Sequence, residues 1–195
     1  MSGFDLDDYI AGAFAEHDEV FQATRRATSD GLAALVGLCA DAVGGGGKLM
    51  FFGNGGSAAD AQHLATELTV RFAGDRAPIA ALSLTTDGSA LTAIGNDLGF
   101  DQLFARQIRA LGRPGDVALA ISTSGRSANV IEGLKAARDM KLTAAGLGGG
   151  GGGAMAGLAD PLLLVPSDAA ARVQEMHILL GQMLCGALER KLGLV

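Results

Sequence analysis

The feature that most constrains this chain is the regular alternation of short apolar runs with helical stretches. Five runs have the length of β-strands, at residues 48–52, 77–84, 116–122, 141–147 and 160–166. Stretches with helical spacing separate them, most clearly at 58–72, 101–111, 127–139 and 169–192. Uniformly apolar strands alternating with helices are typical of a parallel sheet covered on both faces. We therefore predict a three-layer α/β/α fold with a five-stranded parallel sheet.

Residues 5–43, which precede the first strand, carry apolar groups at helical spacing. Thr28 or Ser29 could cap a second helix, so the sequence predicts an N-terminal helical pair. No internal repeat or long linker is visible, which favours a single domain over residues 1–195. Only 18% of the residues are charged, against roughly 25% in an average soluble domain. Apolar surface should remain on the folded monomer, a hint of subunit association.

Charge and cysteine content exclude several function classes. The formal net charge is −6 and no Lys/Arg cluster exceeds two residues, so we expect no nucleic-acid partner. Cys39 and Cys185 lie in apolar contexts, which indicates reduced, packed thiols. The acidic first twelve residues do not resemble a signal peptide, and by this reasoning no apolar segment reaches the ~18 residues of a membrane span. We expect a cytoplasmic protein without membrane contact.

Two small-residue turns follow predicted strands. The first is GNGGS at 53–57, and the second is ISTSGRSAN at 121–129. Ligands of parallel α/β folds bind beyond the carboxyl ends of strands, and a helix N-terminus attracts phosphate. The second turn adds four hydroxyl groups, those of Ser122, Thr123, Ser124 and Ser127. The pattern indicates an anion site, the alternative being a turn that is merely serine-rich.

Motifs that are absent or incomplete in these turns argue against some classes of phosphate compound. The P-loop ending in Gly-Lys-Ser/Thr is absent, so a nucleoside triphosphate has no support. Gly53, Gly55 and Ala58 satisfy a loose dinucleotide fingerprint, but the nearest suitable acid, Asp87, lies 29 residues beyond Ala58 instead of about 20. Two anion turns favour a small phosphorylated molecule, with a dinucleotide-binding oxidoreductase as an alternative.

The helix after the first turn carries a polar pair. His63 and Glu67 are four residues apart and share a helix face, and Asp60 lies close to the same line. Such a pair can bind a divalent metal or transfer protons, and it can also be a pair of solvated neighbours.

The last helix places polar residues in an apolar stretch. A glutamine there is costly unless it is bonded or ligated, so Gln174 and Gln182 could border one cleft. His177 is interpreted as a core histidine with one hydrogen bond. The glycine run at 148–153 reads as a mobile loop after the fourth strand, or alternatively as a backbone cradle or lid.

Four ordered segments resemble the sugar isomerase (SIS) domain, and within it the phosphoheptose isomerase family. They are GNGGSAADAQHLATEL, LTTDGSALTAIGNDLGFDQLFARQI, GDVALAISTSGRSANVIEGL and RVQEMHILLGQMLCGALE. The resemblance covers nearly the whole chain. It implies a flavodoxin-like, three-layer subunit, a homotetramer with active sites at subunit interfaces, and interconversion of sedoheptulose 7-phosphate and the aldoheptose 7-phosphate through an enediol.

The same resemblance implies roles for individual residues. Glu67 matches the carboxylate that transfers the proton, and His63 and Glu67 match zinc ligands. Gln174 matches a residue that touches both substrate and metal. The sugar phosphate contacts implied are Asn54, Gly55, Gly56, Ser57, Asn96, Asp97, Ser122, Thr123, Ser124 and Ser127.

One position departs from the family pattern. Gln182 stands where the isomerases usually carry a histidine that is implicated in zinc binding and acid–base work. An amide can offer an oxygen to a metal, but it cannot take up and return a proton near neutral pH. The departure keeps open a second function: a non-catalytic SIS-domain protein that binds a phosphosugar or acts as a scaffold, similar to the protein that associates with the bacterial replication initiator. That relative lacks the glutamate of the His–Glu pair, which this chain retains.

Overall fold

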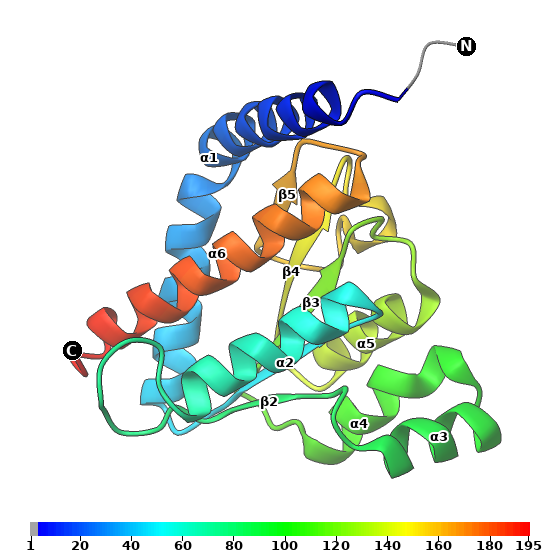
Figure 1. Cartoon of the computed structure of the whole chain (residues 1–195). Coiled ribbons are helices and arrows are strands. Elements are labelled where there is room, and N and C mark those ends of the chain that lie inside the picture. The colour runs from blue at the N-terminus through cyan, green and yellow to red at the C-terminus, as the bar shows by residue number, and fades with distance from the viewer. Residues whose placement is uncertain (1–3) are drawn as a thin grey trace.

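The fold, seen in a computed structural model that describes residues 4–195, is built on one five-stranded sheet (Figure 1). All strand pairs are parallel and the order is β2-β1-β3-β4-β5, the flavodoxin-like order. The strands are β1 (Leu49–Gly53), β2 (Ala81–Ser83), β3 (Val117–Ser122), β4 (Thr143–Gly149) and β5 (Leu162–Val165). The predicted fold class is confirmed.

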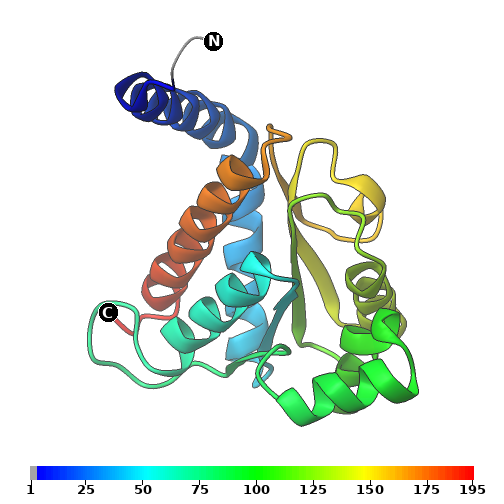
Figure 2. The same ribbon diagram turned by 45° about the vertical axis from the view of Figure 1, so that its right-hand side comes forward.

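Helices cover both faces of the sheet, as the apolar strands require (Figure 2). On one face, α1 (Leu6–Gly44), α2 (Gly56–Thr69) and α6 (Ala170–Lys191) enclose a core with alternate side chains of the strands. On the other face, α3 (Gly88–Asp97), α4 (Leu103–Leu111) and α5 (Ala128–Asp139) enclose a second core. Two short 3-10 turns, η1 (Phe100–Gln102) and η2 (Gly153–Met155), complete the elements.

The predicted N-terminal helical pair is wrong in one respect, because α1 is a single helix of 39 residues. Thr28 and Ser29 do not cap a second helix. Their hydroxyls, like that of Thr24, donate to the carbonyl oxygen four residues earlier, at 2.6–2.8 Å. Such bonds satisfy the hydroxyl inside a continuous helix and favour bending. Figures 1 and 2 show α1 changing direction partway along.

α1 also corrects the expectation that no segment is apolar enough to span a membrane. It is long enough, and its best 18-residue window reaches a mean hydropathy of 1.2. One third of that window is buried. Its buried side chains, among them Leu32, Leu35 and Val36, belong to the core that α1 shares with β5 and α6. α1 thus packs as a helix of the folded domain.

The glycine run does not form a loose loop. Gly148 and Gly149 extend β4, and Gly148 pairs with Ser122 at the end of β3. The carboxyl ends of β1, β3 and β4 therefore lie side by side. This edge of the sheet collects both polar turns and the glycine run.

Candidate functional site

The two polar turns meet at the carboxyl edge of the sheet. Gly53 ends β1 in register with Ile121 of β3. A Cβ atom at Gly53 would lie 2.5 Å from the Ile121 carbonyl oxygen and 2.7 Å from Cβ of Ser57, so only glycine fits. The side-chain amides of Asn54 and Asn129 exchange two hydrogen bonds of 2.8 and 2.9 Å across the turns. Asn129 is buried, and the sequence reasoning gave it no role; its place in the second polar turn was the available signal.

The β3–α5 turn folds on its own hydroxyls. Ser122 Oγ accepts a hydrogen bond from the Gly125 N–H, and Ser124 Oγ accepts one from the Arg126 N–H. Ser127 holds the N-cap position of α5, yet its side chain makes no capping hydrogen bond. The Ser127 hydroxyl is therefore free to donate to a ligand at the start of α5.

α6 closes the space between the two turns. The amide of Gln174 lies against Gly56 so closely that a Cβ at Gly56 would stand 2.4 Å from Gln174 Nε2. The cavity between the two turns measures about 120 Å³, against about 30 Å³ for one water. It is lined by Asn54, Ser57, Ile121, Ser122, Thr123, Ser124, Ser127 and Gln174. Seven of the predicted sugar phosphate contacts thus come together, and the helices α2 and α5 both begin there.

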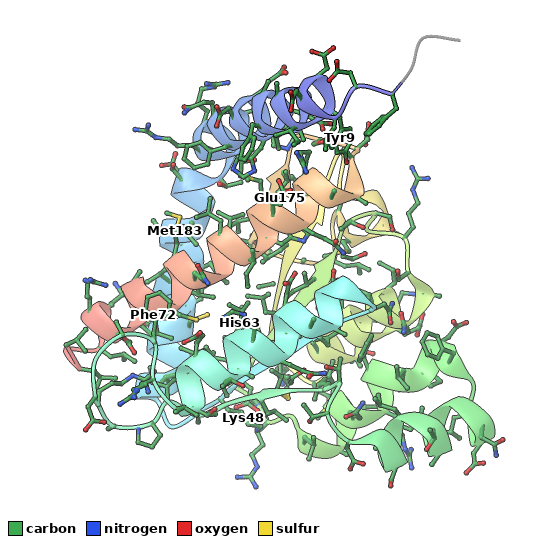
Figure 3. All side chains as sticks on the ribbon, in the orientation of Figure 1. Tyr9, Lys48, His63, Phe72, Glu175 and Met183 are labelled. Carbon is green, nitrogen blue, oxygen red and sulfur yellow. The ribbon has the colours of Figure 1, made fainter. Side chains whose placement is uncertain are left out.

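The polar pair lies further along α2. His63 Nε2 stands 2.9 Å from Glu67 Oε1, and the side chains are 43% and 23% exposed. In Figure 3 His63 lies at the edge of α2 next to α6. Asp60 is one turn closer to the cavity. Burial raises the pKa of Asp60, nearby His63 lowers it by less, and its Oδ2 is buried without a partner among the described residues.

α6 passes close to α2 at the level of the pair. A Cβ at Gly181 would be 2.6 Å from the Leu64 side chain, so the helices meet one residue from His63. Gln182, the next residue on α6, is partly buried and does not line the cavity, whereas Gln174 does. His177 is fully buried, and its Nε2 donates to the Gly148 carbonyl oxygen at 3.1 Å. The interpretation of His177 as a core histidine is confirmed.

A buried ion pair that the sequence reasoning missed holds the end of α2. Arg76 and Glu189 have side chains that are each 1% exposed, and Arg76 Nε donates to Glu189 Oε1 at 2.6 Å. The same guanidinium donates to the carbonyl oxygens of Leu68 and Glu67, at 2.7 and 2.8 Å. The backbone of Glu67 is thereby fixed to α6. The two charges are 113 residues apart, so no local pattern announces them.

Asn96 and Asp97 lie outside this cluster. They end α3, are exposed, and bond to each other at 2.7 Å. Neither lines the cavity. Their role in binding the sugar phosphate stays a prediction.

The metal donors near the His63–Glu67 pair are fewer than a zinc site in a protein uses. Among residues 4–195, no group of three His, Cys, Asp or Glu side chains is placed to hold a metal ion. His63 and Glu67 supply one imidazole and one carboxylate, whereas zinc sites in proteins use three or four such ligands. The amide oxygens of Gln174 and Gln182 are the remaining predicted ligands. This donor set does not fit a tight zinc site.

Comparison with known proteins gives a consistent family. The model of the SIS domain matches residues 14–149. The phosphoheptose isomerase of Paramagnetospirillum magneticum is 57% identical over 93% of this chain and 94% of its own, and that of Geotalea daltonii is 50% identical over 94% and 95%. Among solved structures, the phosphoheptose isomerase of Neisseria gonorrhoeae is 44% identical with a TM-score of 0.90, covering 95% of this chain and 100% of its own. That of Francisella tularensis is 34% identical with a TM-score of 0.92, covering 96% and 100%.

Proposed function

The chain belongs to the phosphoheptose isomerase family of SIS-domain proteins, and from this premise we propose that it interconverts D-sedoheptulose 7-phosphate and D-glycero-D-manno-heptose 7-phosphate, with Glu67 as the base. One observation carries the proposal: a hydroxyl-lined cavity at two helix N-termini, with a carboxylate further along one of those helices. The cavity would hold the phosphate, and Glu67 would meet the carbonyl end of the sugar.

The spacing favours a long sugar. Glu67 is eleven residues after Gly56, which corresponds to about 16 Å along the helix. The glutamate side chain leans back towards the helix N-terminus, which shortens this gap by several Å. An extended heptulose 7-phosphate has eight bonds from phosphorus to C1 and spans roughly 10 Å at the rise of an extended chain. A triose phosphate, with four such bonds, would reach about half as far.

The reaction needs one carboxylate that takes up a proton and returns it. Glu67 removes a proton from C1 of the ketose, and the electrons of that C–H bond form the C1–C2 double bond of an enediol. The carbonyl oxygen on C2 gains a proton, which gives the enediol, and the C1 hydroxyl loses a proton only when C2 is protonated in the next step. Protonated Glu67 then delivers its proton to C2, which completes the aldose. Gln182 exchanges no proton in this scheme, because an amide neither accepts nor donates one near neutral pH.

The proposal is tested by incubating the purified protein with sedoheptulose 7-phosphate and measuring the aldoheptose 7-phosphate formed. Glu67→Gln keeps the shape of the side chain and removes the base. We expect its kcat to fall by about 10²-fold or more, as for loss of a general base, with phosphate binding unchanged. Equal kcat values for the two proteins would remove Glu67 from the mechanism.

We propose that zinc, if it is bound here, is held weakly. His63 and Glu67 would be its main ligands, with amide oxygens of Gln174 and Gln182 beside them. Amide oxygens suit hard ions such as Mg²⁺ and Ca²⁺ better than zinc. Glu67 alone therefore carries the proton transfers in the proposed mechanism.

We propose that the chain assembles with copies of itself, as the homotetramer implied by the family resemblance. The first half of α1 projects from the body and exposes Tyr9, Ile10 and Phe14 (Figure 1). A groove of about 500 Å³ runs between α1 and α6, with Phe21, Leu32 and Met183 in its lining. Figure 3 shows Met183 on α6. An apolar surface of this kind is typical of subunit contacts.

The other readings of the sequence are less well supported. A non-catalytic scaffold protein is not favoured, because the relatives at 50% identity or more are phosphoheptose isomerases and Glu67 is present. A cytoplasmic location follows from the proposed metabolic role and remains part of the proposal.

A further inference from the structure

The glycine run, residues 148–153, lies directly against the β3–α5 turn, residues 122–127. This turn would bind phosphate and is called the phosphate turn below. A Cβ atom at Gly149 would be 2.5 Å from the Thr123 carbonyl oxygen. One at Gly125 would be 2.0 Å from the Gly152 carbonyl oxygen, and one at Gly153 would be 2.7 Å from the carbonyl oxygens of Ser124 and Gly125. Real Cβ atoms do not approach other atoms this closely. Backbone packs on backbone along this whole contact.

Hydrogen bonds fix the run from both sides. The Ala154 N–H donates to the Gly125 carbonyl oxygen at 2.9 Å, which ties the run to the phosphate turn. The Gly150 N–H donates to the carbonyl oxygens of Val165 and Ser167, at 2.9 and 3.0 Å. Gly148 accepts the hydrogen bond from His177 on α6. The run is thus anchored to β5, to the segment after it and to α6.

The outer side of the β3–α5 turn faces a hollow. A hollow of about 470 Å³ opens there, lined by Thr123, Ser124, Arg126, Gly149, Gly151, Gly153, Asp168 and Ala170. On that side, the backbone of Thr123 to Gly125 packs against the glycine backbone.

We propose that the backbone of residues 148–153 is a buttress that sets the conformation of the phosphate turn and thereby the affinity for the phosphate group. The inference rests on the proposed function, because it takes Ser122 to Ser127 as the phosphate site. A donor array already in its bound conformation loses less entropy on binding, so its position controls affinity. The buttress touches no reacting atom, and it acts on binding of the anion rather than on proton transfer at Glu67.

The test compares Gly149→Ala with Gly151→Ala. Neither glycine has a positive φ, so alanine brings no backbone strain at either position. At Gly151 an added Cβ meets nothing within 4 Å, whereas at Gly149 it meets Thr123 and Val173. The measurements are the Kd of inorganic phosphate by calorimetry, and kcat and KM for sedoheptulose 7-phosphate.

For Gly149→Ala we expect the phosphate Kd and the KM to rise together, by tenfold or more, while kcat stays within about threefold. Gly151→Ala should match the wild type in all three. A folded Gly149→Ala protein with unchanged phosphate Kd would overturn the buttress. So would a change confined to kcat. Phosphate binding needs no turnover, so a wild type that binds phosphate without isomerising would refute the proposed function and leave the buttress standing. A wild type that binds no phosphate would overturn both.

A double variant separates weaker phosphate binding from misfolding of the core. The added methyl of Gly149→Ala would also lie 2.9 Å from Val173 Cγ2 in the core. Val173→Ala removes that contact and leaves the one with Thr123. Gly149→Ala/Val173→Ala should therefore fold as well as Val173→Ala, and still bind phosphate at least tenfold more weakly than Val173→Ala does. Equal phosphate Kd values for these two proteins would contradict the proposal.

Discussion

The buried imidazole of His177 predicts how far the free energy of unfolding falls when the pH is lowered. Its imidazole is fully buried, and its Nε2–H donates to a carbonyl oxygen, so the ring is neutral and its Nδ1 carries no proton. Nδ1 has no hydrogen-bond partner among the described residues. Burial lowers the pKa of His177 from 6.5 to about 4, and the bond to Gly148 opposes this only in part. Protonation would place a charge and a second unbonded donor in the core.

The direction and size of this pH effect follow from the linkage between proton binding and folding. Between pH 6.5 and 4 the unfolded chain holds a proton on His177 that the folded chain lacks, so the free energy of unfolding falls as the pH falls. At 1.36 kcal/mol per pKa unit, the loss amounts to about 2 kcal/mol from pH 7 to pH 5, and to about 3 kcal/mol by pH 4. His177→Gln keeps a donor for Gly148 and does not titrate.

Urea unfolding at pH 7 and pH 5 measures the effect. Carboxylates titrate in both proteins, so the difference between the two pH dependences isolates His177. We expect the wild type to lose about 2 kcal/mol more than His177→Gln over this interval. Equal losses would show that His177 is accessible to protons in the folded state, and would refute the assignment of a buried neutral ring.

Two further predictions concern zinc and assembly. Gln182→His should bind zinc at least tenfold more tightly than the wild type in a calorimetric titration, because it adds an imidazole beside His63 and Glu67; equal Kd values would place residue 182 away from the pair. Phe14→Glu, at a side chain 70% exposed on α1, should shift the sedimentation coefficient towards smaller species, whereas Phe100→Glu, 60% exposed on η1, should leave it unchanged; a Phe14→Glu protein that sediments like the wild type would contradict assembly through α1.

Local patterns were sufficient for the sheet. Apolar runs placed all five strands. β1, β3 and β4 are buried on both faces, the situation that produces such runs, and the edge strands β2 and β5 are partly buried. The second strand is shorter than the predicted 77–84, since Ile79 donates its N–H to Leu68 of α2 before the ladder of Ala81–Ser83 begins. α3 was not predicted, because Gly88 and Gly95 lower its helix propensity and Ile94 is its one buried residue.

The site was predictable where one segment carried the signal. The turns 53–57 and 121–129 were recognisable from their composition, and the parallel topology brings them together. Contacts between distant segments were beyond reach. The residues of the Asn54–Asn129 pair are 75 positions apart, and the packing of the glycine run on Thr123 is visible only in the three-dimensional structure. A run of glycines indicates flexibility by composition alone, whereas here the missing side chains allow close contact.

Isomerisation in D₂O tests the central claim most directly. While the enediol exists, the proton that Glu67 has taken from the sugar can exchange with solvent. Wild-type protein incubated with sedoheptulose 7-phosphate should yield the aldoheptose 7-phosphate with deuterium at C2, and should place deuterium at C1 of the recovered ketose, as read by NMR. Glu67→Gln should do neither while binding inorganic phosphate with the wild-type Kd. Deuterium exchange by Glu67→Gln at the wild-type rate would contradict the account.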